Sequence, residues 1–238
     1  MRKIILSLLI VIPIISFAQE KVIWDYPVKP GSEEWRYSTY VEKVKKNQPP
    51  FWLMNELKTP ELYGLCIGYP FNMDLFLFNN PNIGIRKILS ESSCWQEFIN
   101  RKDALKVLSS KYNEALINEI MNINDKNERT QKIINIYIIE KIISESDIIK
   151  KSDLKDQKLL IKYLINKHDE KKKFPDEYFG YTYSSTLSAM LKVLESQNKI
   201  NAKISENNDF YNLEKRGINN SEELEQEILT VAESILEL

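Results

Sequence analysis

The sequence predicts an all-α protein, built as a bundle or an irregular stack of short helices behind an extended aromatic N-terminal lead-in. Three observations favour this class. Only 6 glycines occur among 238 residues, and the Asn-Gly and Asp-Gly pairs that mark tight β-hairpins do not occur. Apolar residues recur at helical spacing behind N-cap residues. Prolines and paired polar residues interrupt the apolar stretches at short intervals, without a fixed period that would name a repeat family.

The first part of the chain predicts an extended lead-in followed by short helices. The segment from Trp24 to Gly31 carries two prolines and a glycine among aromatic residues, which favours an extended backbone that packs through its aromatic side chains. Ser32 is typical of an N-cap, and the two glutamates after it suit a first helical turn, so a helix is predicted from there to Lys46. Pro49-Pro50 ends that helix and starts another, and Thr59-Pro60-Glu61 repeats the start signal.

The middle of the chain predicts several short helices packed against each other. From Pro60 to about Asn122, the apolar stretches are interrupted at residues 68–70, 79–81 and 92–93. In Met73–Phe78 the apolar residues would fall on both faces of a strand. We therefore expect a buried helix over these residues.

Longer helices are predicted in the second half. The β-branched run Ile133–Ile139 is ambiguous by itself, but charged residues surround it over a span longer than a strand, which favours a helix. Ser152-Asp153 and Asn220-Ser221 are N-cap signals in front of apolar faces at helical spacing. The charged stretch Lys167–Lys173 lies between them and predicts the end of a helical block, followed by an exposed connection.

The N-terminus has the three zones of a secretory signal peptide. Arg2 and Lys3 precede an apolar run from Ile4 to Ile15, and Ser16-Phe17-Ala18 places small residues where a signal peptidase needs them. A retained membrane anchor is the alternative, but this run is shorter than the about 20 residues that span a bilayer, and Pro13 interrupts it. We therefore expect cleavage after Ala18 and a periplasmic or extracellular product.

The expected organisation is a signal peptide at residues 1–18, a helical domain at 19–166 and a C-terminal helical segment at 167–238 that packs on the same domain. The mature chain would begin at Gln19 rather than at a cysteine, so we expect no lipid attachment and a soluble product. Loss of the two leader cations leaves 31 basic and 34 acidic residues, a net charge of −3. This balance argues against nucleic acid as a partner, and no later apolar stretch is long enough to span a bilayer.

Cys66 and Cys94 are the two cysteines of the chain, an even number that permits one disulfide in an exported protein. Such a bond would close a loop of about 29 residues and contribute about 3 kcal/mol to stability. The alternative is a pair of separate buried thiols. Their spacing is unlike a CxxC motif, so neither a redox motif nor a zinc knuckle is predicted.

The sequence offers few groups for catalysis. His168 is the only histidine, and its charged neighbours predict a solvated surface imidazole rather than a member of a Ser-His-Asp or Cys-His site. One histidine and two distant cysteines do not supply a zinc site, and no P-loop or dinucleotide-binding turn occurs, so we expect no metal and no cofactor. A glycosidase needs two carboxylates at a set separation, which leaves no local signature, so a carboxylate-dependent hydrolase stays open.

Two aromatic clusters are candidate binding surfaces. The first mixes aromatic and acidic side chains in a way that suits a sugar, although packing of the aromatics into the core is favoured. Its members are Trp24, Asp25, Tyr26, Glu33, Glu34 and Trp35. The second follows the charged stretch, and its members are Phe174, Tyr178, Phe179, Tyr181 and Tyr183. Tyrosines on a loop are common in binding surfaces, and a loop folded down over the helices is the alternative.

The lead-in also carries a resemblance to a known group of proteins. Trp24–Gly31 together with Glu34-Trp35 resembles the mature N-terminus of an uncharacterised secreted protein family of gut-type Bacteroidetes bacteria. The similarity continues through Cys66–Pro70, Phe78–Asn80 and Arg101–Ala104, so it covers about the first half of the mature chain. The resemblance implies export to the periplasm or beyond, and it assigns no catalytic or ligand-binding residue.

The leading hypothesis is an exported helical protein that binds another protein or an envelope component and performs no chemistry. The rival hypothesis is a hydrolase that acts on a glycan or a peptide through carboxylates. A cleft with facing carboxylates would favour the rival, whereas an exposed aromatic patch would favour binding. A structural subunit of the cell surface is a third hypothesis, which stable self-association would support.

Overall fold

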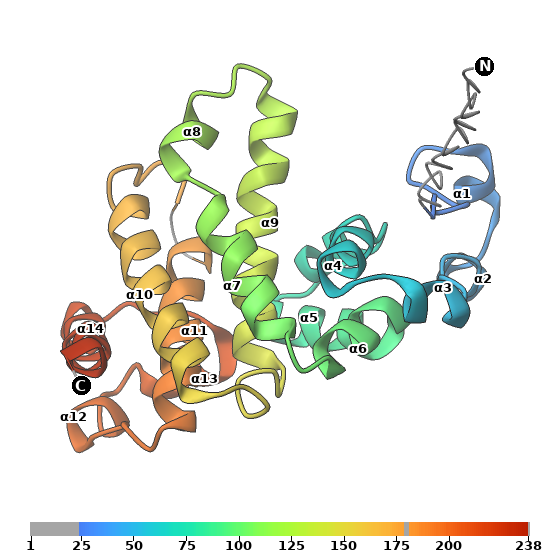
Figure 1. Cartoon of the computed structure of the whole chain (residues 1–238). Coiled ribbons are helices and arrows are strands. Elements are labelled where there is room, and N and C mark those ends of the chain that lie inside the picture. Colours follow the sequence, from blue (N-terminus) through green and yellow to red (C-terminus); the bar gives the residue numbers. More distant parts are fainter. Residues whose placement is uncertain (1–23, 179–180, 238) are drawn as a thin grey trace, which may run out of the picture.

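The computed structural model describes residues 24–178 and 181–237. Within these ranges the backbone forms fourteen α-helices and one 3-10 helix and no strand, which confirms the predicted all-α class (Figure 1). The leader predicted at residues 1–18 lies outside the described residues, as does Phe179. In the part of the chain that the structure describes, no helix combines the length and the apolar character needed to cross a bilayer.

The N-terminal half consists of short helices behind the lead-in at residues 24–32. They are α1 (Glu33–Tyr37), α2 (Tyr40–Lys46), α3 (Phe51–Glu56), α4 (Thr59–Ile67), the 3-10 helix η1 (Asn72–Leu77), α5 (Pro81–Glu91) and α6 (Ser93–Asn100). Helices α4–α6 lie between α1–α2 and the longer helices of the second half (Figure 1).

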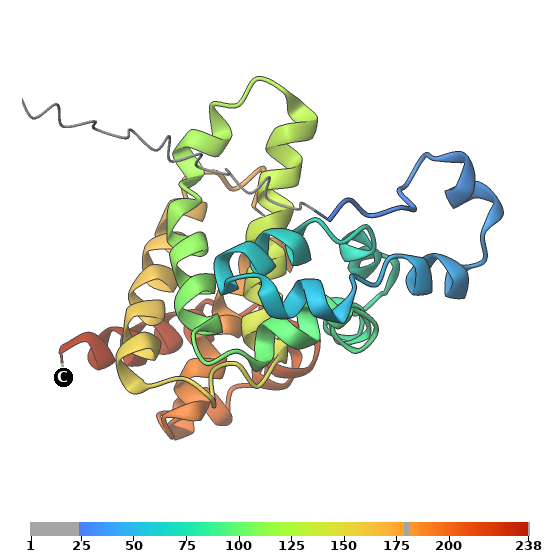
Figure 2. The same ribbon diagram turned by 45° about the vertical axis from the view of Figure 1, so that its right-hand side comes forward.

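The second half holds the longer helices. They are α7 (Ala104–Glu114), α8 (Ile117–Met121), α9 (Lys126–Glu145), α10 (Leu154–Lys171), α11 (Tyr181–Ser196), α12 (Ala202–Ser205), α13 (Phe210–Arg216) and α14 (Glu222–Glu237). Helix α11 packs against α9, α10, α13 and α14, so it lies at the centre of this half. One cluster of buried apolar side chains extends from the lead-in to α14, and Figure 2 shows the lead-in and α1 reaching outward from the helices.

The local start signals lie where the sequence predicts them. The Ser32 hydroxyl accepts the Trp35 N–H at 3.1 Å and caps α1. Asp153 caps α10 in the same way, and the Ser221 hydroxyl accepts a backbone N–H of α14 at 3.1 Å. The ambiguous run Ile133–Ile139 lies inside α9, so the helix prediction is confirmed there.

Two predicted helices differ from the structure. The helix expected from Ser32 to Lys46 is broken at Ser38, because the next residue, Thr39, forms its own capping box with Glu42 and starts α2. The buried helix expected over Met73–Phe78 is a 3-10 helix that is buried on one side only. Its three residues per turn place Asn72 and Leu75 toward the core, while Met73, Phe76 and Leu77 are exposed.

The exposed connection predicted at Lys167–Lys173 is also wrong over most of its length. Helix α10 continues to Lys171, and Lys167, His168 and Lys171 are all buried. These three residues continue the spacing of the apolar face that includes Leu164, so they point at the core rather than at solvent. The predicted division between residues 166 and 167 therefore falls inside a helix.

Candidate functional site

The lead-in is fixed to the helices by alternate residues. Tyr26 is buried, and its hydroxyl donates to the Leu65 carbonyl of α4 at 3.0 Å. Val28 is fully buried, and its backbone N–H and C=O pair with the Asn47 side chain at 3.1 and 2.7 Å. Because side chains alternate in an extended backbone, Asp25 and Pro27 point away from the core.

This arrangement leaves a cavity of about 720 Å³ between the lead-in and α4, which we call the lead-in groove. Its walls are mainly apolar. They are lined by Trp24, Asp25, Tyr26, Lys29, Pro30, Leu57, Pro60, Glu61, Gly64, Leu65, Gly68, Pro70 and Lys111. The volume lies within the range of about 300–1,000 Å³ that is typical of ligand sites.

The side of the groove that α4 forms carries little side-chain volume. Gly64 and Gly68 lie one turn apart on the exposed face of α4, and a Cβ atom at Gly64 would meet nothing within 4 Å. The opposite wall holds Trp24, which is partly buried. Its indole N–H is buried and has no hydrogen-bond acceptor among the described residues.

Trp35, the other tryptophan of the first aromatic cluster, lies elsewhere. Its ring packs at 5.0 Å from the Phe71 ring, and the Lys43 ammonium lies 4.7 Å from its centre. The acidic residues of that cluster do not face each other across a cleft. Glu34 pairs with Lys46 at 2.5 Å, and Asp25 pairs with a lysine of the lead-in. The structure thus brings Trp24 and Tyr26 of this cluster to the groove, but not Trp35.

The side chains of the second aromatic cluster that the structure describes do not form an exposed patch. Tyr178 is 3% exposed, so the folded-down alternative describes it. Tyr181 begins α11, and Phe179 lies outside the described residues. Tyr183 is half-buried, and its hydroxyl lies 2.8 Å from His168 Nε2 and donates to Glu225 Oε1 at 2.9 Å. Tyr178 and Tyr183 therefore take part in the packing of the protein interior.

His168 is fully buried, so the prediction of a solvated imidazole is wrong. Its ring lies between α10 and α14, where Nε2 is 3.3 Å from Glu225 Oε1. Burial by itself would raise the pKa of Glu225, but hydrogen bonds from His168, Lys172 and Tyr183 outweigh burial and lower this pKa to about 2. The cluster fastens α14 to α10, and its residues line neither the lead-in groove nor a second cavity among α5, α9, α11 and α13.

A second buried cluster joins four helices. Glu140 of α9 is fully buried, and Lys171 Nζ lies 2.8 Å from each of its carboxylate oxygens. The hydroxyls of Tyr112, Ser185 and Thr186 donate to the same carboxylate, that of Tyr112 at 2.5 Å. Both charges are thus paired and hydrogen-bonded, as buried ions need to be. This cluster is a packing element with no exposed atom to offer a ligand.

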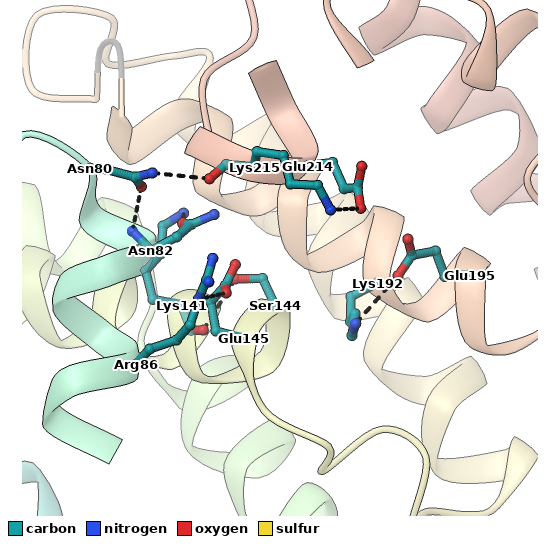
Figure 3. Close-up of polar contacts among 10 residues, drawn as sticks. All are labelled: Asn80, Asn82, Arg86, Lys141, Ser144, Glu145, Lys192, Glu195, Glu214 and Lys215. Atoms are coloured by element: carbon teal, nitrogen blue, oxygen red, sulfur yellow. Dashed lines mark hydrogen bonds and ion pairs between the residues drawn. The ribbon is translucent and has the colours of Figure 1, made fainter. Parts of the chain in front are cut away.

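A second cavity, of about 280 Å³, lies among α5, α9, α11 and α13, and we call it the polar cleft (Figure 3). Charged residues of both signs dominate its lining. Its charged residues are Arg86, Glu145, Lys192, Glu195, Glu214 and Lys215. Arg86 Nε donates to Glu145 Oε2 at 2.7 Å, whereas Lys192 and Glu195 pair with each other on α11. Burial raises the pKa of Glu145, and the positive charge of Arg86 opposes that shift.

Lys141 lies one helical turn before Glu145 and is fully buried beside the polar cleft. Its ammonium donates to Asn82 Oδ1 at 2.8 Å, and among the described residues no carboxylate lies within ion-pair distance of it. Burial lowers the pKa of Lys141 to about 8, although the charges of Glu145 and Glu140 oppose this shift. Gly217, at φ +67°, covers the ammonium so closely that any Cβ there would collide with it.

Cys66 and Cys94 are present as free, fully buried thiols, and they lie close enough to hydrogen-bond with each other. Among the described residues, no three His, Cys, Asp or Glu side chains are arranged to hold a metal ion. No protein-family model, curated protein or solved structure matches the chain. The two cavities and their chemistry therefore carry the functional argument alone.

Proposed function

We propose that this protein is an exported binding module that takes an apolar segment of a partner protein into the lead-in groove. The observation that carries the proposal is the groove itself, which combines a ligand-sized volume with mainly apolar walls. A protein segment suits these walls better than a sugar, because the apolar surface is large and the charged residues are few. The signal peptide predicted at residues 1–18 supports export.

The distribution of exposed apolar side chains also supports an interaction surface in this half. Five large hydrophobic residues between positions 37 and 52 are exposed, and they are Tyr37, Tyr40, Val41, Phe51 and Trp52. Exposed apolar side chains that gather in one region are typical of protein-binding surfaces. The N-terminal helices therefore offer contacts beyond the groove.

Filling the groove tests the proposal. Gly64→Phe adds a large side chain where a Cβ meets nothing, so the helix should fold and the groove should close. The tagged protein, carrying its own leader, would be crosslinked mildly in its host and purified with its partners. Asn55→Phe, on the exposed surface of α3 outside the groove, is the matched control. A partner that the wild type and the control retain and Gly64→Phe loses supports the groove; a partner held equally by all three refutes it.

A hydrolase that uses carboxylates is the second candidate, and the polar cleft favours it. Glu145 has a raised pKa because it is buried, while Glu195 and Glu214 line the same cleft. A carboxyl group with a raised pKa near a second carboxyl group is the arrangement that glycosidases use for general acid catalysis. In this alternative, Glu145 is the acid and one of the other two glutamates is the base or the nucleophile.

Turnover assays on glycan and peptide libraries test this alternative. Glu145→Gln keeps the shape of the side chain but removes its proton, so a turnover that depends on the cleft should fall by at least about 100-fold while the melting temperature is kept. Turnover that survives in Glu145→Gln would exclude Glu145 as the acid. The Gly64→Phe variant should leave such turnover unchanged, which separates the two proposals.

A further inference from the structure

Two buried cysteines lie on neighbouring helices next to the lead-in groove. Cys66 is in the last turn of α4, and Cys94 is in the first turn of α6, and the two helices pack against each other. Both side chains are fully buried, and the two thiols lie close enough for each to shift the pKa of the other. Leu65, the residue before Cys66, lines the groove.

The surroundings of the two sulfurs are unequal. The Ser92 hydroxyl lies 3.3 Å and the Tyr26 hydroxyl 3.7 Å from the sulfur of Cys94. Burial alone would raise the pKa of Cys94, but hydrogen bonding with Cys66 and Ser92, together with the nearby Tyr26 hydroxyl and Trp95 N–H, outweighs burial, so the pKa is lowered. Burial and the neighbouring Cys94 raise the pKa of Cys66.

The different pKa shifts of Cys94 and Cys66 give the two cysteines different roles in disulfide formation. A thiolate is the attacking species in thiol–disulfide exchange, and a thiolate is favoured at a helix N-terminus among hydrogen-bond donors. Two of the donors to Cys94, Ser92 and the Trp95 N–H, lie within two residues of it along the chain. They are therefore in place as soon as the start of α6 forms, before the core closes over the sulfurs.

We propose that Cys66 and Cys94 form a disulfide during folding of the exported chain, with Cys94 as the attacking thiol and Cys66 as the resolving thiol. The Cys94 thiolate attacks one sulfur of an incoming disulfide, on a small molecule or on an oxidoreductase, and expels the first thiolate, which takes up a proton. Cys66 then loses its proton and attacks the Cys94 sulfur of the mixed disulfide, which expels the second thiolate. The two cysteines lose two electrons, and the incoming disulfide is reduced to two thiols.

The bond has to form before folding is complete, because neither sulfur is exposed in the folded chain. Burial also protects the finished bond, since a reductant has no path to it until the chain opens. The bond would hold α4 to α6 under the groove, and Tyr26 connects this point to the lead-in by donating to the Leu65 carbonyl. The proposal does not depend on what the groove binds.

The full chain, secreted through its own leader and denatured without reductant, tests the bond directly. We expect the mass to be two hydrogens lower than that of the dithiol, with no reaction with iodoacetamide until a reductant is added. Two alkylated cysteines before reduction would overturn the proposal. If secretion fails, the full chain is unfolded, reduced and refolded in glutathione buffers, and the same readout applies: persistent free thiols at every oxidised-to-reduced ratio would also overturn it.

Single variants test the two roles. In the refolding assay, Cys66→Ala leaves Cys94, which should form a mixed disulfide with glutathione faster than Cys66 does in Cys94→Ala. Equal or reversed rates would overturn the assignment of the attacking thiol. Reduction should lower the melting temperature of the wild type by about 6–12 °C. The double variant Cys66→Ala/Cys94→Ala should show no response to reductant, which separates the bond from the packing of the side chains.

Discussion

Replacing Lys141 with methionine should change how the stability of the protein depends on pH. The ammonium of Lys141 is fully buried and has an amide oxygen rather than a carboxylate as its hydrogen-bond partner. Burial lowers its pKa from 10.5 to about 8 in the folded protein. Between these two values the unfolded state binds more protons than the folded state, so the lysine makes stability rise as the pH rises. Methionine has a similar shape and removes the titration.

The size of the effect follows from the two pKa values. At pH 7, charging Lys141 in the folded state costs about 3 kcal/mol relative to the unfolded chain. This cost falls by about 1 kcal/mol at pH 9 and by about 2.5 kcal/mol at pH 10. The variant also leaves Asn82 without its donor, which costs about 1–3 kcal/mol at every pH. The pH dependence therefore isolates the charge, whereas the difference at a single pH does not.

Urea unfolding of the wild type and of Lys141→Met at pH 7, 8, 9 and 10 measures this dependence. The stability of the wild type relative to the variant should rise by about 2.5 kcal/mol across the series. Gly64→Ala, which changes no titrating group, should show a constant difference from the wild type over the same range. If the difference between the wild type and Lys141→Met is also constant, the ammonium is solvated and the buried setting beside Asn82 is wrong.

Three further outcomes are expected. Gly64→Ala should stabilise the protein by about 0.5–1 kcal/mol in urea unfolding, because it adds a helix-forming residue in open space. Gly84→Ala should destabilise it by about 1–3 kcal/mol, because its Cβ would lie 2.6 Å from the backbone of η1. Equal effects of the two substitutions would contradict this packing. Lys171→Met should cost about 3–5 kcal/mol, because it leaves the buried carboxylate of Glu140 without its counter-charge, and a cost below 1 kcal/mol would show that this carboxylate reaches water. The pKa of Glu225 is lowered to about 2, so its contribution to stability is present above about pH 4.5 and is lost as the pH falls toward 2. Glu225→Gln should therefore reduce the fall in melting temperature over this pH range. An unchanged fall would contradict the ion cluster around Glu225.

The sequence predicts the features that depend on neighbouring residues. Ser32, Asp153 and Ser221 cap helices through bonds to a backbone N–H three residues later, so the signal and its partner lie in one short stretch. The same locality applies to the break at Ser38 inside the helix predicted from Ser32 to Lys46. Thr39 and Glu42 stand at the capping-box spacing, so neighbouring residues also encode this break, and the prediction of a single helix did not take them into account.

The features that depend on distant partners are not predictable in this way. His168 was assigned to the surface because its chain neighbours are charged, but its partners Tyr183 and Glu225 follow 15 and 57 residues later. One local signal did exist. The spacing of Leu164, His168 and Lys171 continues the buried face of α10, and helical periodicity would have placed these residues inside despite their charge.

The residues of the candidate site also fall into two groups, those that the local sequence identifies and those that only contacts between distant segments explain. Trp24 was identified from its place in an aromatic segment, and the structure places it in the groove. Gly64 and Leu57 also line that groove but carry no binding signature, because a glycine on a helix leaves space for a ligand only where another segment crosses above it. The polar cleft was not predicted, since its four elements come from three separate parts of the chain.

The contrast between two buried lysines indicates where a second activity would be found. Lys171 is matched by both oxygens of Glu140, so its burial is balanced by pairing. Lys141 has no such match, and an apolar side chain at that position would serve folding better. What its charge affects is the ionisation of Glu145, one turn along α9 in the polar cleft, whose raised pKa the lysine opposes. A costly charge that acts on a cleft carboxylate suits a functional role, so the cleft, and not the fully paired Glu140 cluster, is the place to look for chemistry.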